Sequence, residues 1–315
     1  VILVLIFKFI AHKGFKKRII NKALEKIYRE FEEENFTPDI ITGHFVLPQL
    51  QILHFLKEKY TNSQTCLVLH GECSNIPKIY PEYKTYFKSV NVWGFRSEAF
   101  KNCFESNFGK QNNSFICYSG IPKEYINENI KKDFSNGINH FSFLGSLFKL
   151  KRVDDTIKSL KNIFGDESFR FDIIGDGAER SNIEGLIKEL DLLEKVKLYG
   201  EVKREKAQEI IAESQCFIMV SSREAFGLVY VEAMAKGCIT IGTKGQGIDG
   251  VIKHGENGFL CNSSNVEELT NLIREIINLP NSELVRISNN AIETAKNLTD
   301  RKVAEHYINS VINAK

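Results

Sequence analysis

The chain has 315 residues, of which 43% are hydrophobic and 26% are charged, as in an ordinary globular protein. A single hydrophobic core stops growing near roughly 250 residues, so this length predicts two domains. With 42 Lys and Arg against 40 Asp and Glu, the formal net charge is only +2, and no long basic block occurs. These features argue against nucleic acid as a partner.

The seven cysteines are odd in number, scattered and without a C-x-x-C pair. This pattern indicates neither a disulfide framework nor a zinc site, and we expect reduced thiols in a cytoplasmic protein. The opening run 1–10 is apolar but contains Lys8, and it is about half of the roughly 20 residues that a membrane helix needs. It has no basic region before it and no cleavage site, which favours a buried strand over a signal peptide.

The first part of the chain alternates apolar runs with segments of helical periodicity. The expected elements, in chain order, are a strand at 1–10, a helix at 15–34, an apolar run at 39–41, a helix at 48–60, a strand at 65–70, a helix at about 95–109 and a strand at 115–118. Strands that alternate with helices predict a parallel sheet with helices on both faces.

The polar segment 122–137 interrupts this alternation and predicts a linker. Strands are then expected at 141–147, 169–175, 196–199, 216–220, 238–242 and 258–261, with helices between them at about 152–164, 178–190, 203–214, 227–236 and 265–278. The tail 282–314 predicts two consecutive helices. The sequence therefore predicts an α/β protein with two Rossmann-like, doubly wound domains at 1–133 and 134–315, which bind ligands in a cleft at the carboxyl ends of their strands.

The most informative segment is SSREAFGLVYVEAMA at 221–235, which follows a predicted strand and opens a helix. Gly227 has no side chain to obstruct a ligand at the helix start. The free backbone amides of Phe226, Gly227, Leu228 and Val229 can receive a diphosphate, assisted by the helix dipole.

Two carboxylates lie in the same segment. Glu224 precedes the predicted helix and Glu232 lies within it, so eight residues of helix would place them about 12 Å apart, near the same face. They would then hold hydroxyl groups on opposite sides of a diphosphate, an arrangement that suits a nucleotide sugar. Two surface glutamates without a function are the alternative.

The E-A-F-G-L-x-x-x-E-A-M-A pattern resembles the E-x7-E motif of glycosyltransferase family 4, whose members are retaining enzymes with the two-domain GT-B fold. In that family the first Glu contacts the donor sugar and the second contacts the ribose, and the resemblance assigns these roles to Glu224 and Glu232. It implies front-face transfer without a metal. It implies no cofactor either, because the nucleotide sugar, expected to be UDP- or GDP-linked, is a substrate.

The segment F-L-G-S-L at 143–147, followed by Lys151, resembles the family's G-R-L-x-x-x-K turn. The Arg and Lys of that turn neutralise the departing diphosphate, so the resemblance implies a catalytic role for Lys151 and donor binding at Gly145 and Ser146. Ser146 stands where Arg is usual, and Lys149 or Arg152 are candidates for the second charge. A solvated lysine at a helix start is the alternative for Lys151.

Two further turns resemble donor-binding segments of the family. Gly175, in the G-D-G turn at 175–177, corresponds to a glycine turn near the nucleotide, although any tight turn can use glycine. Gly245, in T-K-G-Q-G-I at 243–248, is expected to border the sugar and phosphates. The H-G-E-N-G-F-L segment at 254–260 is interpreted as a structural turn.

Two histidines end predicted strands in the first part of the chain. His70, in L-V-L-H-G at 67–71, corresponds to a family histidine that lies beside the donor phosphate and sugar, which implies a catalytic role. His44 ends D-I-I-T-G-H, which resembles a family strand of the form D-I-I-h-x-H, and its role stays open. The Y-S-G-I-P turn at 118–122 is expected to shape the cleft. Structural histidines are the alternative at both positions.

Family members usually begin with a strand and a glycine-rich loop, and neither precedes Val1, which is also not an initiator Met. We therefore expect the first domain to lack its N-terminal segment. The main alternative is a non-catalytic protein or partner subunit that retains a nucleotide-sugar pocket, and a GT-B nucleotide-sugar epimerase is a third. A nicotinamide dehydrogenase is disfavoured because no G-x-G-x-x-G follows a strand.

The resemblance also implies a glycan or lipid-linked acceptor and a role in cell-surface polysaccharide synthesis. For a lipid-linked acceptor, the basic and apolar helix at 13–28 would give a peripheral contact with the inner face of the membrane. Core packing of that helix, with a solvated basic face, is the alternative.

Overall fold

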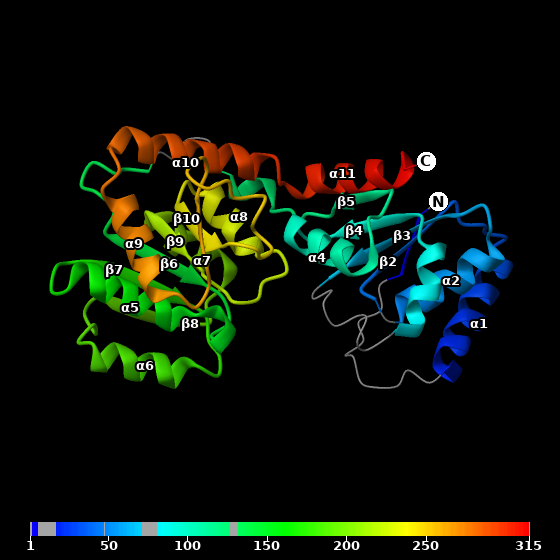
Figure 1. The fold of residues 1–315 in the computed structure, drawn as a ribbon, viewed down its shortest axis with the longest axis horizontal. Coiled ribbons are helices and arrows are strands. Elements are labelled where there is room, and N and C mark those ends of the chain that lie inside the picture. Colours follow the sequence, from blue (N-terminus) through cyan, green and yellow to red (C-terminus); the bar gives the residue numbers. More distant parts are fainter. Residues whose placement is uncertain (1, 6–16, 47, 71–80, 127–131, 315) are drawn as a thin grey trace. The chain divides into compact units, whose positions relative to one another are not determined.

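The computed structural model describes residues 2–5, 17–46, 48–70, 81–126 and 132–314 (Figure 1). The chain divides into two compact units. The first unit comprises Val1–Tyr118 with Ala304–Lys315, and the second unit comprises Ser119–Val303. No helix within the described ranges is long and apolar enough to cross a membrane.

The first unit contains a parallel sheet whose described strands are neighbours in chain order. The strands are β1 (Ile2–Leu5), β2 (Ile40–His44), β3 (Gln64–Leu69), β4 (Val92–Phe95) and β5 (Ser114–Ile116). The connecting helices are α1 (Lys17–Glu33), α2 (Gln49–Lys59), the 3-10 helix η1 (Pro81–Ser89) and α4 (Glu98–Phe108). The rest of the strand predicted at 1–10 lies outside the described residues.

The strand order decides which face of this sheet each helix covers. Right-handed crossovers that always step in the same direction put their helices on the same face of a sheet. Leu67 and Leu69 accordingly pack in one cluster with residues of α2 and α4. Cys66 and Val68 point to the other face, where they pack with Val311 of α11 (Asp300–Ile312). The end of the chain thus completes the core of the first unit, and Figure 1 shows α11 in red beside β5.

Strand β4 is absent from the sequence-based prediction, which began a helix at about residue 95. The helix begins later, because the Ser97 hydroxyl accepts a hydrogen bond from the Phe100 amide and caps α4. The strand Val92–Phe95 ends two residues before that cap and pairs with β3 and β5, buried along its length. A Cβ on Gly94 would lie 2.8 Å from Val68 Cγ2, so the glycine permits close packing at this point.

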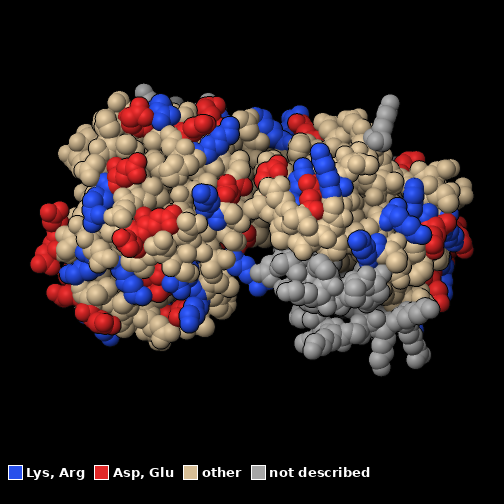
Figure 2. Space-filling view, in the orientation of Figure 1, with Lys and Arg blue, Asp and Glu red and all other residues tan. Residues whose placement is uncertain are grey.

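The apolar stripe of α1 is buried. Ile20 and Leu24 are 4% and 6% exposed and pack with Ile41 of β2. The described residues at the helix surface carry both signs of charge, for example Lys26 and Glu30, and Figure 2 shows positive and negative side chains interspersed over the described part of one face. A membrane contact through α1 stays a prediction, and it would rest on surface charge because the apolar stripe packs in the core.

The cysteines follow the prediction only in part. Five of them, Cys66, Cys117, Cys216, Cys238 and Cys261, are buried free thiols, as expected for residues on or beside apolar strands. Cys103 on α4 is disulfide-bonded, so the expectation of reduced thiols throughout is wrong at this residue. Odd number and irregular spacing did not reveal this bond, because a disulfide depends on the distance between cysteines in the fold.

The second unit contains a parallel sheet in the order β11-β10-β9-β6-β7-β8. Its strands are β6 (His140–Leu144), β7 (Arg170–Ile174), β8 (Val196–Gly200), β9 (Cys216–Ile218), β10 (Ile239–Thr243) and β11 (Phe259–Cys261). Its helices are α5 (Val153–Phe164), α6 (Arg180–Glu189), α7 (Arg204–Glu213), α8 (Leu228–Ala235), α9 (Val266–Ile277) and α10 (Asn281–Lys296), with the short 3-10 helices η2 (Lys123–Tyr125) and η3 (Lys149–Lys151). Each strand and α-helix expected in this part of the sequence is present.

The order of these strands reverses between β6 and β9. From β6 the chain steps to β7 and β8, and it then returns to the other side of β6 with β9, β10 and β11. Consecutive crossovers therefore place helices on both faces of the sheet, as the doubly wound prediction requires. The fold class is confirmed for two parallel-sheet, Rossmann-like domains.

The compact units do not divide at 133/134, where the sequence placed the boundary. The amide of Ile121 donates to Leu298 O and the amide of Asp300 donates to Ile121 O, both at 2.9 Å. A Cβ on Gly120 would lie 2.5 Å from the Asp300 Cα. These contacts attach the segment after Tyr118 to the second unit, while α11 returns to the first.

Candidate functional site

The predicted donor-binding segments of the second unit begin at the reversal of its sheet. β6 pairs directly with β9, through Phe141 with Cys216 and Ser142 with Phe217. β6 continues into the turn that contains Gly145, and β9 continues into the segment that contains Glu224. The connections after these two strands turn to opposite faces, and the crevice between them is where doubly wound sheets bind ligands.

Lys151 and Glu224 form an ion pair at this crevice. Lys151 Nζ lies 2.6 Å from Glu224 Oε2, and the two side chains are 17% and 16% exposed. The backbone joins the same two segments, because the Ser222 amide donates to Leu150 O at 2.8 Å. Residues 73 positions apart in the sequence thus form one charged centre that stays partly open to solvent.

The two candidates for a second positive charge behave differently. Arg152 donates two hydrogen bonds of 2.7 Å to the carboxylate of Asp155, so its guanidinium group is already paired. Lys149 lines a separate hollow between α5 and α6. Ser146 is exposed. Lys151 is therefore the one cation of this turn that the described contacts bring to Glu224.

The loop before α8 differs from the helical spacing expected for the two glutamates. α8 begins at Leu228, after Gly227 with a φ of +80°, so Glu224 lies in a loop and not on the helix. A Cβ at Gly227 would lie 2.4 Å from the Tyr230 ring, and the positive φ also favours glycine. The expectation that eight residues of helix separate the carboxylates is therefore wrong, because the chain turns sharply between them.

A second loop holds Glu224 in place. The Glu224 amide donates to Gln246 Oε1 at 3.0 Å, and the Gly247 amide donates to Glu224 O at 2.9 Å. A Cβ on Gly247 would lie 2.3 Å from the Ala225 carbonyl carbon, so the loops touch backbone to backbone. Gly245 lies in the same loop, is exposed and donates its amide to Asp249 Oδ2. Gly245 was predicted as a site residue in this segment, whereas Gln246, which supports Glu224, was not.

The predicted glycines Gly145 and Gly175 lie against each other. The Gly145 amide donates to Ile174 O at 3.0 Å, and a Cβ on Gly175 would lie only 2.0 Å from Gly145 O. Gly175 also has a φ of +130°. Close packing and the positive φ are sufficient reasons for glycine at these positions, and neither reason involves a ligand. Direct contact of either residue with a nucleotide stays a prediction.

Glu232 is almost completely buried in α8, with 5% exposure. Its Oε1 accepts a hydrogen bond of 3.0 Å from Arg204 Nη2, and its Oε2 accepts one of 2.7 Å from Gln208 Nε2. A carboxylate has about four acceptor positions, so capacity remains for the two hydroxyls of a ribose. Neither partner was predicted from the sequence, because Arg204 and Gln208 lie 28 and 24 residues before Glu232 and no motif links them.

The start of α8 offers backbone donors beside these carboxylates. Phe226 is buried at 3% exposure, whereas Gly227, Leu228 and Val229 are partly exposed. The first amides of a helix have no acceptor within the helix, and the helix dipole favours an anion there. A phosphate contact by these residues fits this position and stays a prediction.

His70 and His44 form a second polar centre, within the first unit. His44 is the last residue of β2 and His70 follows β3, and His44 Nδ1 lies 2.9 Å from His70 Nε2. Burial, Arg96 and His44 together lower the pKa of His70 to about 4, and burial and Arg96 lower the pKa of His44. Both imidazoles are therefore neutral at pH 7. Gly71, which completes the predicted His-Gly motif, lies outside the described residues.

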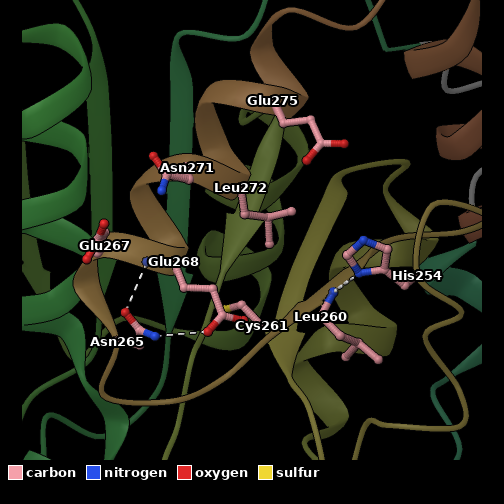
Figure 3. A pocket seen from close by; sticks show the side chains of 9 residues that line it. All are labelled: His254, Leu260, Cys261, Asn265, Glu267, Glu268, Asn271, Leu272 and Glu275. Carbon is pink, nitrogen blue, oxygen red and sulfur yellow. Dashed lines mark hydrogen bonds between the residues drawn. The ribbon is translucent and has the colours of Figure 1, made fainter.

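Two hollows of the second unit lie away from the predicted site residues. One, of about 510 Å³, lies beside α9, and Figure 3 shows its lining, in which Asn265 binds Glu268 and the Leu260 amide donates to His254. The other, of about 500 Å³, lies between α5 and α6. Among the described residues, no group of three or more His, Cys, Asp or Glu could hold a metal ion.

Comparison with known proteins relates this arrangement to a family. Residues 126–294, more than half of the chain, match the family described as Glycosyl transferases group 1. An uncharacterized glycosyltransferase of Methanocaldococcus jannaschii is 29% identical over 251 residues, which are 78% of this chain and 67% of that protein. N-acetyl-alpha-D-glucosaminyl L-malate synthase of Bacillus anthracis is 38% identical over 113 residues, which are 36% of this chain and 29% of that enzyme. The chain thus spans two thirds or less of the length of these relatives.

Solved structures agree with the fold. The lipopolysaccharide outer core galactosyltransferase WaaB superposes with a TM-score of 0.78 at 16% identity, over 95% of this chain and 81% of that one. Anabaena HepE, solved in complex with UDP, gives a TM-score of 0.75 at 18% identity, over 94% of this chain and 82% of that one. At such identities the likeness establishes the fold alone. With the family match and the Lys151–Glu224 centre, it leads to one conclusion: this chain belongs to the group 1 glycosyl transferases.

Proposed function

We propose that the protein transfers a sugar from a nucleotide-diphosphate sugar, with retention of anomeric configuration, to a glycan or lipid-linked acceptor. The observation that carries the proposal is the Lys151–Glu224 ion pair at the reversal of the second sheet. In the free protein each side chain neutralises the other. When a donor binds, Lys151 is available to its diphosphate and Glu224 to a hydroxyl of its sugar.

The chemistry needs charge stabilisation more than a nucleophile. As the sugar leaves, negative charge grows on the diphosphate, and Lys151 with the first amides of α8 would stabilise it. These charged and N–H groups need not move as the charge develops, because the loops that carry them are held by backbone contacts such as that from the Ser222 amide to Leu150 O. We propose that these groups replace a metal ion, and that no cofactor takes part. Glu232, oriented by Arg204 and Gln208, would bind the ribose.

Similar proteins support the donor class and the biological role. HepE from Anabaena was solved with UDP, and also with UDP and glucose, and WaaB is a lipopolysaccharide galactosyltransferase. LpsE of Rhizobium meliloti, a lipopolysaccharide core biosynthesis glycosyltransferase, is 29% identical over 122 residues. We infer a UDP- or GDP-linked donor and a role in cell-surface polysaccharide synthesis, with the protein acting in the cytoplasm or on the inner face of the membrane.

A donor panel tests the proposal directly. UDP-, GDP- and ADP-sugars are added to the full chain and to Glu232→Ala, in EDTA, while thermal stability and sugar release are recorded. We expect one base to raise the Tm of the unaltered chain, slow hydrolysis with retention, and loss of the shift in the variant. Lys206→Met, at an exposed lysine on α7, is the control and should keep both signals.

Each other outcome selects a different function. Binding without hydrolysis or transfer would favour a non-catalytic subunit that retains the pocket, for which Ser146 in place of Arg is the supporting observation. Epimerised sugar nucleotide without an acceptor would favour an epimerase. If divalent metal were required for turnover, the proposed charge neutralisation by Lys151 would be wrong.

A further inference from the structure

The two histidines of the first unit form part of a longer row of side chains. His44 Nδ1 lies 2.9 Å from His70 Nε2, and Tyr307 Oη lies 3.5 Å from His44 Nε2. The rings of His44 and Tyr307 stack with centroids 5.9 Å apart and an interplanar angle of 20°. Tyr307 belongs to α11, so residues from β2, from the end of β3 and from the last helix meet here.

The protonation of this row is restricted. A neutral imidazole carries one hydrogen, on either Nδ1 or Nε2, and the other nitrogen accepts. Burial and Arg96 keep His44 neutral, and burial raises the pKa of Tyr307, so its hydroxyl keeps its hydrogen. A single hydrogen must therefore lie between His44 Nδ1 and His70 Nε2. The nitrogen to which it is bonded decides the tautomer of both rings.

We propose that His44 is a positioning residue for His70: it donates its Nδ1 hydrogen to His70 Nε2 and so fixes His70 as the tautomer with hydrogen on Nδ1. In this arrangement the Tyr307 hydroxyl donates to His44 Nε2, 3.5 Å away, so that Nε2 accepts and the His44 hydrogen resides on Nδ1. This inference rests on the proposed function only where it assigns a use to His70.

The surroundings of His70 hold its ring in one orientation. Phe45 lies with its ring centroid 4.3 Å from that of His70, and its amide donates to Val68 O at 2.8 Å. Phe45 has a φ of +72° and is 47% exposed, an unusual conformation for a large side chain, and such conformations cluster at functional sites. Among the described residues, none hydrogen-bonds His70 Nδ1.

The tautomer determines what His70 can do. With hydrogen on Nδ1 and Nε2 occupied by His44, His70 has a donor to offer and no free lone pair, so it cannot remove a proton from an acceptor hydroxyl. It would donate a hydrogen bond to an oxygen of a bound substrate. This role needs no change of protonation during the reaction, and it agrees with the depressed pKa of His70.

The test measures the tautomer itself. The full chain is labelled with 15N-histidine, and long-range proton–nitrogen correlation spectra identify which ring nitrogen of His70 carries hydrogen at pH 7. We expect hydrogen on Nδ1 of both His44 and His70. In His44→Phe, which keeps the ring volume but cannot donate, we expect mixed tautomers of His70 and a loss of turnover of roughly tenfold or more at unchanged donor Kd.

Two further variants separate positioning from packing. His44→Asn places an amide nitrogen near the former Nδ1 and should restore the His70 tautomer and most of the turnover. Tyr307→Phe removes only the hydroxyl and should shift the tautomer ratio partly. Tyr28→Phe is the matched control, since it also removes one hydroxyl, which bonds Phe55 O in the same unit, and it should change neither signal.

Hydrogen on Nε2 of His70 in the unaltered chain would overturn the proposal. So would a His44→Phe variant that folds with an unchanged His70 tautomer. The spectra need no substrate, so they decide this inference even if the chain transfers no sugar. Turnover that is absent from every variant and from the unaltered chain would instead contradict the proposed function.

Discussion

The two sheets of this protein organise polar residues in different ways. In the second unit, strand order reverses between β6 and β9, and the residues that follow those strands, Lys151 and Glu224, meet as an ion pair. In the first unit, the described strands run in chain order. His44 at the end of β2 hydrogen-bonds His70 after β3, and burial and the charge of Arg96, which follows β4, lower the pKa of both histidines.

This difference relates topology to the kind of site that a sheet can build. A reversal sends neighbouring connections to opposite faces and opens a crevice, so the side chains in it stay available to a ligand. A sheet without a reversal brings successive strand ends together, so their side chains bond one another. Its remaining face needs a separate cover, which α11 supplies through Val311.

The largest effect is expected where the turns after β6 and β7 touch. Gly175→Ala would place a Cβ 2.0 Å from Gly145 O at a φ of +130°, and should destabilise the second unit by about 4 kcal/mol. Gly185→Ala is the control, because nothing lies near its Cβ and alanine favours a helix. Calorimetry should show a loss for the first variant and a small gain for the second, and equal stabilities would contradict the close approach.

The ion pair itself comes next. Lys151→Met should lower kcat by roughly 10²- to 10³-fold, because it removes the charge that we propose stabilises the leaving diphosphate. Lys149→Met, two residues earlier on the same turn, lines the hollow between α5 and α6 and should change kcat little. Steady-state kinetics with the identified donor would compare the two, and equal losses would mean that the turn acts through its overall charge.

The free energy of unfolding of the first unit should depend on pH through two partly buried histidines, His70 and His44. His70 has a folded pKa of about 4 against an ordinary value of 6.5, so the unfolded chain binds its proton first as pH falls. The free energy of unfolding should therefore decrease from about pH 6.5 down to pH 4, by at most about 1.4 kcal/mol per pH unit for this group. His44, with a lowered pKa, adds to the same trend.

Trp93 allows this decrease to be measured in one unit. It is the only tryptophan of the chain and is buried in β4, so its fluorescence during urea unfolding reports on the first unit. His70→Gln should flatten the pH dependence, whereas His254→Gln, at an exposed histidine of the second unit, should leave it unchanged. A Trp93 transition independent of pH between 6.5 and 4 would show that His70 protonates freely in the folded state.

The smallest effect is expected at Arg204. Arg204→Met removes one of two donors from Glu232 and should weaken donor binding by about fivefold, or about 1 kcal/mol, since Gln208 still orients the carboxylate. Isothermal titration with UDP or GDP, whichever binds, would measure the change. An unchanged Kd would mean that Arg204 does not help to orient Glu232 for the proposed ribose contact.

Regular periodicity made most elements predictable. Each strand of the second unit, and the helices between them, could be expected from apolar runs and turn residues, because those signals are local. Strand β4 was missed because its four residues contain Gly94 and only two residues separate them from α4, and only pairing with β3 and β5 makes them a strand. The capping residue Ser97 was the available signal for the boundary.

The sequence by itself determined the fold class and the family resemblance, and it singled out Lys151, Glu224, Glu232 and His70, since motifs record which side chains follow which strands. Only the tertiary structure decided which of them meet. Lys151 forms an ion pair with Glu224, Arg152 pairs with Asp155, and His44 contacts both His70 and Tyr307. Apart from the local Arg152–Asp155 pair, these contacts join residues 26 to 263 positions apart, and their distances depend on strand order, which no local pattern of residues encodes.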